Sequence, residues 1–166
     1  MKVMKKVLAM VLVLTMILSV TGCAKKVTDK KSFKNAVEKC DYDDDNVNES
    51  DPDDKDIKKA FYFHEDDIYA YVVIYKDKDD AKDDFDDMYD DLKDAVDDGD
   101  FDGKVKKSGL FTKKITVNGE YDTKYNDSEY YCVVALSGTT MIMVYEYDNG
   151  KSAQKDVNAL VKAMGF

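Results

Sequence analysis

Short stretches in which side-chain character alternates residue by residue constrain this chain more than any other feature. Five such stretches occur, at 57–64, 68–75, 110–117, 129–136 and 140–147. Alternation sends successive side chains to opposite faces of a sheet. Strands that follow one another without an intervening helix usually pair antiparallel. The sequence therefore predicts an antiparallel sheet of about five strands.

Three other stretches repeat apolar residues at spacings of three and four, which is typical of an amphipathic helix. The first begins after Thr28 or Asp29, the second follows Asp77 and covers 78–96, and the third begins at Ser152. The predicted order is α-β-β-α-β-β-β-α, an α+β fold with the helices packed on one face of the sheet. Residues 41–56 are expected to form an acidic loop, and Asn118-Gly119 a turn that closes the third strand.

The predicted strand–turn–strand–helix unit occurs twice, at 57–96 and 129–166, at an offset of 72 residues. Identity between the two segments is low, so they indicate either an internal repeat or two units that obey the same packing rules. Residues 29–166 suit a single α+β domain with its own core.

The first 23 residues have the composition of a secretion signal. Three lysines fall within the first six residues, and an uncharged apolar run from Val7 to Val20 leads to Thr21-Gly22-Cys23. The run is too short for a helix to span a bilayer core of about 30 Å. It therefore predicts a cleaved signal peptide at 1–22, followed by a tether at 23–28.

A signal that ends in small residues and a cysteine resembles the bacterial lipoprotein signal. The resemblance implies that Cys23 receives a diacylglycerol group and that the domain lies at the extracytoplasmic face of the cell membrane. The chain also resembles small lipoproteins of low-GC Gram-positive bacteria in Asp79-Asp80-Ala81-Lys82 and in the closing Gly165-Phe166. This second resemblance implies location and fold, and no activity.

The charge of the chain is strongly uneven. The formal charge is −10, and it becomes −13 without the three lysines of the signal. Residues 23–40 carry a net +4, whereas residues from 41 onward carry a net −17. So acidic a domain would repel phosphate backbones, and nucleic acid is therefore excluded as a partner. The basic segment beside Cys23 either attracts anionic lipid or is a solvated helix start.

One face of the predicted sheet gathers tyrosine and methionine, which are enriched at recognition surfaces. Two alternatives stay open, because tyrosine is also a good strand former and because the first helix could cover this face. The face predicts non-enzymatic binding of a protein or envelope partner. Its candidate residues are Tyr69, Tyr71, Tyr75, Met141, Met143, Tyr145 and Tyr147.

The stretch from Asp98 to Gly103 provides an alternative function. Asp98, Asp100 and Asp102 alternate before a glycine, as in the first half of an EF-hand calcium loop. The twelfth position is Gly109 in place of the usual glutamate. The alternative is therefore a divalent-cation module that binds calcium at this loop, and otherwise no cofactor is expected.

Residues that could support catalysis are sparse. His64 is the only histidine, and there is neither a zinc-ligand spacing nor a glycine-rich phosphate loop. We therefore expect no enzymatic activity. Cys40 and Cys132 either form a disulfide or are small buried hydrophobic residues, and the sequence leaves that choice open.

Overall fold

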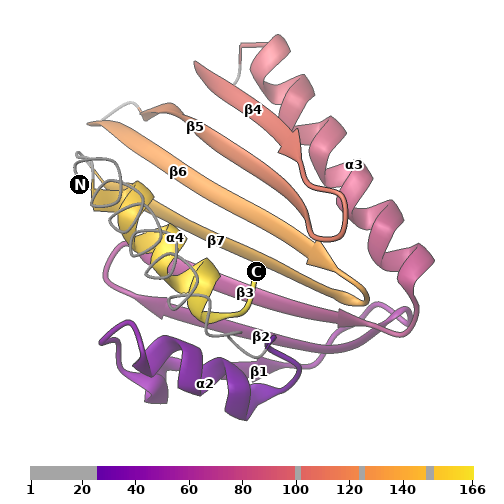
Figure 1. The fold of residues 1–166 in the computed structure, drawn as a ribbon. Helices are drawn as coiled ribbons and strands as arrows, with labels where there is room; N and C mark the ends of the chain where they lie inside the picture. Colours follow the sequence, from indigo (N-terminus) through magenta and orange to yellow (C-terminus); the bar gives the residue numbers. More distant parts are fainter. Residues whose placement is uncertain (1–25, 100–101, 124–125, 149–151) are drawn as a thin grey trace, which may run out of the picture.

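The computed structural model describes residues 26–99, 102–123, 126–148 and 152–166. The predicted signal peptide, Cys23 and Asp100 lie outside these residues. Figure 1 shows an α+β fold built on one antiparallel sheet of seven strands, in the order β1-β2-β3-β7-β6-β5-β4. The strands are β1 (Asn48–Ser50), β2 (Ile57–Glu65), β3 (Ile68–Tyr75), β4 (Asp102–Ser108), β5 (Lys113–Thr123), β6 (Asn126–Ser137) and β7 (Thr140–Asp148). The helices are α2 (Lys30–Glu38), α3 (Lys78–Asp97) and α4 (Ser152–Ala163), with a short 3-10 turn η1 (Asp44–Asn46).

The α+β class is confirmed, whereas the predicted number of strands and their order are wrong in detail. β1 lies inside the predicted acidic loop, and β4 lies outside the five predicted strands. β5 runs straight through Asn118-Gly119, which pairs with Lys104 and Gly103 of β4 and so forms no turn. β4 escaped prediction because its lysines hide the alternation, although charged side chains are typical of an edge strand.

Helices cover both faces of the sheet, which corrects the prediction that they share one face. α2 and α4 bury Phe33, Val37, Val157 and Leu160 in one core cluster. The inward side chains of α3, including Phe85, belong to a separate cluster on the opposite face. Figure 1 shows α2 and α4 across the near face and α3 alongside β4.

The side chains of β5 illustrate how helices cover both faces of the sheet. Ile115 and Val117 are buried under α3, while Lys114 and Thr116 alternate with them on the other face and are only half-buried. α2 and α4 therefore cover the β2, β3, β7 and β6 side of one face, and α3 covers the β4, β5 and β6 side of the other. The helices therefore cover diagonally opposite parts of the two faces, and part of each face is left without a helix.

The helix starts expected from the sequence are confirmed at two positions. The Asp29 side chain accepts a hydrogen bond from the backbone N–H of Ser32 at 2.7 Å, and the Ser32 hydroxyl oxygen accepts one from the backbone N–H of Asp29, which completes a capping box. Asp77 accepts from the backbone N–H groups of Asp79 and Asp80 at the start of α3. Within the described ranges, no helix is long and apolar enough to cross a bilayer.

The two segments of the possible repeat each contain a hairpin and a helix. β2, β3 and α3 form the first, and β6, β7 and α4 form the second. Their helices lie on opposite faces of the sheet. The correspondence therefore extends to the hairpins and stops at the helices.

Candidate functional site

The open part of the α3 face carries a continuous surface of aromatic rings, here called the aromatic platform. Antiparallel register builds it in rows. His64, Tyr69 and Tyr145 lie side by side across β2, β3 and β7, and Tyr62 lies beside Tyr71 in the next row. The platform comprises Tyr62, His64, Tyr69, Tyr71, Tyr130, Tyr145 and Tyr147.

The rings of the platform pack on one another. The His64 ring stacks on Tyr69 with centroids 4.1 Å apart, and Tyr69 stacks on Tyr145 at 4.9 Å. Tyr130 and Tyr147 extend the cluster, with centroids 5.1 Å apart. Offset and edge-on pairs at such distances each contribute about 0.5–1.5 kcal/mol beyond the area they bury. The cluster is therefore an ordered surface of mutually supported rings.

The platform is exposed to solvent, and the exposed fractions separate the predicted residues into an exposed part and a buried part. Tyr71 is 36% exposed and Tyr147 39%, and Tyr62 beside them is 41% exposed. Tyr75 and Met141 are only 4% and 5% exposed, because they belong to the core cluster under α3. The remaining predicted residues, Tyr69, Met143 and Tyr145, are half-buried. The first helix does not cover this face, since α2 packs on the other one.

Hydroxyl groups within the platform are held in the neutral form. Burial raises the pKa of Tyr145, and a hydrogen bond to Tyr71 raises it further. Burial likewise raises the pKa of Tyr130, whose hydroxyl bonds to Cys132. The His64 Nε2 donates to the carbonyl oxygen of Asp66 at 2.9 Å, which fixes the ring against Tyr69. The platform therefore offers neutral ring faces and hydroxyl groups.

The helix α3 borders the platform, and its two flanks carry different charges. On the β4 and β5 side, Asp86 binds Lys107 at 2.7 Å and Lys113 at 3.6 Å. On the opposite side, Asp84 accepts a hydrogen bond from the hydroxyl of Tyr75, the last residue of β3. The flank with Asp84 therefore faces β3, on the side of the sheet where Tyr130 and Tyr145 pack against the core cluster of α3.

Helical periodicity extends this flank into a row of carboxylates. Residues three, four and seven apart share one side of a helix. The lysines of α3, at positions 78, 82 and 93, lie away from that side. The row comprises Asp80, Asp84, Asp87 and Asp91. One border of the platform is thus acidic and carries no lysine from α3.

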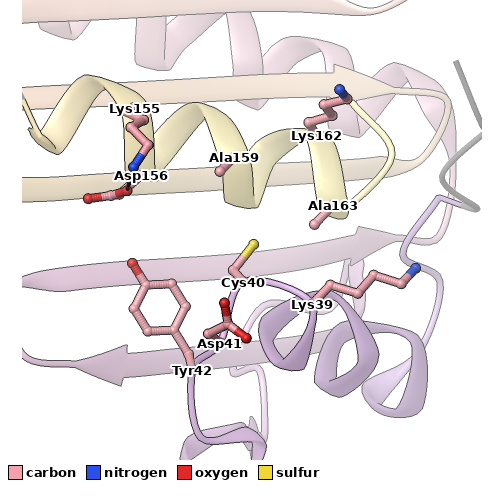
Figure 2. A pocket seen from close by; sticks show the side chains of 9 residues that line it. All are labelled: Lys39, Cys40, Asp41, Tyr42, Lys155, Asp156, Ala159, Lys162 and Ala163. Carbon is pink, nitrogen blue, oxygen red and sulfur yellow. Dashed lines mark ion pairs between the residues drawn. The ribbon is translucent and has the colours of Figure 1, made fainter. Parts of the chain in front are cut away.

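A separate pocket of about 430 Å³ lies on the other face, between the end of α2 and α4. Figure 2 shows Cys40 projecting toward α4 beside Tyr42, with Lys155 and Lys162 on the far wall. Burial and the nearby Asp41 and Asp156 raise the pKa of the Cys40 thiol, which disfavours the reactive thiolate. The residues that line the pocket include no histidine that could serve as a base for the thiol.

Cys40 and Cys132 are both free thiols that pack in different core clusters on opposite faces of the sheet. Burial raises the pKa of Cys132 to about 12. This sulfur therefore behaves as a small buried hydrophobic group.

The predicted calcium loop is only partly described. Asp98 is the C-terminal cap of α3, Asp102 opens β4, and Asp100 lies between the described ranges. Among the residues that the structure describes, no group of three or more His, Cys, Asp or Glu side chains is placed to hold a metal ion. In the acidic loop predicted at 41–56, Asp43 caps η1, and Lys34 pairs with Asp44 and Asp45. These contacts give the aspartates at 43–45 a structural role.

Three members of the platform were missed from the sequence, namely Tyr62, His64 and Tyr130. The signal was present in β2, where Tyr62 and His64 alternate with the buried Phe61 and Phe63. Comparison with protein-family models, curated proteins and solved structures gives no match.

Proposed function

We propose that the protein is a lipid-anchored, extracytoplasmic domain that binds a partner, without catalysis, through the aromatic platform. The observation that carries the proposal is the stack of rings from four strands, which the helices leave open. Exposed aromatic surfaces of this kind favour recognition, because tyrosine buries a large area at a small cost in side-chain entropy.

The border of the platform defines the chemistry of the partner. A lysine or arginine side chain can lay its aliphatic stem on tyrosine rings and place its charge over a ring face. The same charge is then attracted to the carboxylates on the platform side of α3, such as Asp84 and Asp91. We therefore infer that the partner presents a basic polypeptide segment.

A titration with a decalysine peptide tests this proposal, with the tyrosine fluorescence of the full chain as the readout. The chain contains no tryptophan, so its emission reports tyrosine. We expect Tyr62→Ser together with Tyr71→Ser to weaken binding about 30-fold, since each exposed ring contributes roughly 1 kcal/mol. Asp84→Asn with Asp91→Asn should weaken binding several-fold and reduce its dependence on salt.

Matched controls separate the platform from general acidity. Asp83→Asn with Asp90→Asn removes the same charge from the solvent side of α3, and Leu110→Ser removes an exposed apolar side chain elsewhere. Both should bind nearly as the parent does. Equal losses for the two aspartate pairs would mean diffuse attraction to an acidic protein. Unchanged binding after loss of both tyrosines would refute the platform as the site.

A further inference from the structure

The turn between β4 and β5 exposes two adjacent large apolar side chains. Leu110 is 92% exposed and Phe111 96%, whereas the other exposed large hydrophobic side chains of the described residues reach at most 41%. Leaving both in water gives up the stabilisation that apolar burial would bring. Such a pair at a loop tip marks a surface that meets another apolar phase.

Lysines surround this tip, in a domain that is otherwise acidic. The segment 103–118 contains five lysines and no acidic residue, and we call it the basic hairpin. Its lysines are Lys104, Lys106, Lys107, Lys113 and Lys114. Lys107 and Lys113 bind Asp86 of α3. Lys104, Lys106 and Lys114 point to the opposite face, and none of these three forms an ion pair within the described part of the chain.

Backbone geometry fixes the shape of the tip. Gly109 has φ +93, a conformation that other residues rarely adopt. A Cβ atom at this position would lie 1.9 Å from the carbonyl oxygen of Thr112. The turn is therefore tight, and it holds Leu110 and Phe111 outside the sheet.

The tip lies at the same end of the sheet as the start of the described chain. Lys113 pairs with Leu136 at the end of β6, and Ser137 follows at once. The Nζ of Lys26 donates a hydrogen bond to the Oγ of Ser137. Lys26 stands three positions after Cys23 in the sequence. A lipid on Cys23 would therefore hold this end of the sheet at the bilayer.

We propose that the basic hairpin docks on an anionic lipid surface, with Leu110 and Phe111 inserted among the acyl chains and the lysines against the headgroups. Apolar insertion and attraction to anionic lipid act together in such contacts. The inference rests on the hairpin and stands whether or not the aromatic platform binds a partner.

Acidic groups at the same end set the orientation of the docked domain. The loop 51–56 and the start of α3 carry aspartates beside the end of β3, where the backbone N–H of Lys76 bonds to the carbonyl of Asp56. The basic hairpin lies at the other edge of the sheet. Repulsion at the acidic corner and attraction at the basic one tilt the domain onto the β4 edge.

A tryptophan at the tip tests the proposal, because the chain has no other tryptophan. The full chain with Phe111→Trp is mixed with vesicles of equal parts phosphatidylglycerol and phosphatidylcholine, with or without brominated acyl chains. We expect a blue shift of the emission and quenching by the brominated chains. Tyr62→Trp, on the platform, should show neither. Since the readout is local, an N-terminal anchor can hold the chain on the vesicle without producing the signal.

Charge substitutions complete the test. Lys106→Gln with Lys114→Gln in the Phe111→Trp chain should weaken partitioning tenfold or more, at about fivefold for each lysine. Lys155→Gln with Lys162→Gln on α4 removes the same charge and should have little effect. Tryptophan emission that stays unquenched when the Phe111→Trp chain meets anionic vesicles would overturn the proposal. Equal quenching in pure phosphatidylcholine, or equal effects of the two lysine pairs, would overturn the role of anionic lipid.

Discussion

The substitution Phe85→Ala tests how the second core cluster is held together. Phe85 is 0% exposed, and with Ala81 it is one of the two fully buried side chains of α3. The Nζ of Lys107 lies 5.6 Å from its ring centroid, and that of Lys113 lies 5.8 Å away. Removing a buried phenylalanine side chain costs about 3–5 kcal/mol, from lost burial and from the cavity left behind. Both lysine side chains are partly exposed, so each of the two cation–π contacts adds about 1 kcal/mol.

Urea denaturation followed by circular dichroism measures this cost. A domain of this size has about 5–15 kcal/mol of stability, so the variant should fold and unfold at a clearly lower midpoint. Leu110→Ala is the matched control, because its side chain is 92% exposed and its loss should change stability by less than about 0.5 kcal/mol. A cost below about 1 kcal/mol for Phe85→Ala would refute the packing of α3 on this face.

Three further predictions concern charge and the turn. A hydrogen bond from Lys107 lowers the pKa of Asp86, so its stabilisation is present above about pH 4 and is lost as the pH falls further. Asp86→Asn should cost about 1 kcal/mol at pH 7, since the carboxylate is partly solvated, and less at about pH 2 in the same urea assay. Gly109→Ala should cost about 1–3 kcal/mol in that assay, because alanine must adopt a left-handed backbone there, and a neutral effect would contradict the tight turn. Millimolar calcium should raise the melting temperature by screening the aspartates of α3, and the rise should survive Asp100→Asn with Asp102→Asn. A rise abolished by this pair would establish the loop as a calcium site.

Local pattern was enough to predict much of the sheet. The β2–β3 and β6–β7 hairpins follow from alternation and short turns, and the starts of α2 and α3 follow from Asp29 and Asp77. The clustering of tyrosines on one face also follows from alternation, since register needs only the period of two. Each of these features is decided within a few residues along the chain.

The choice of face for each helix was beyond sequence reasoning, because it depends on residues far apart. Tyr75 and Met141 are buried since α3 crosses their end of the sheet, while Tyr71, four residues before Tyr75, stays exposed. The alternation of Ile115 and Val117 with polar neighbours was the available signal. This alternation indicates a second covered face only if β4 is recognised as a strand, and the lysines of β4 mask its own alternation.

The last prediction concerns the proposed lipid anchor. Two residues separate Cys23 from Lys26, so the Cα atoms of these two residues lie at most about 11 Å apart, and the Lys26 side chain contacts Ser137 at the end of the sheet. The ring of Tyr69 lies six residues along β3 from Tyr75, about 20 Å further from that end. The anchor and the basic hairpin can therefore meet the bilayer while the distal part of the platform faces away. The two acyl chains of a diacylglycerol group would anchor the protein stably, and the basic hairpin would add a second contact that orients the domain on the bilayer. Cys23→Ser should release the processed protein from membranes or leave it held by an uncleaved signal, as fractionation of cells would show. A processed Ser variant that stays with the membranes as the parent does, after a high-salt wash that removes charge-dependent docking, would refute the lipid anchor.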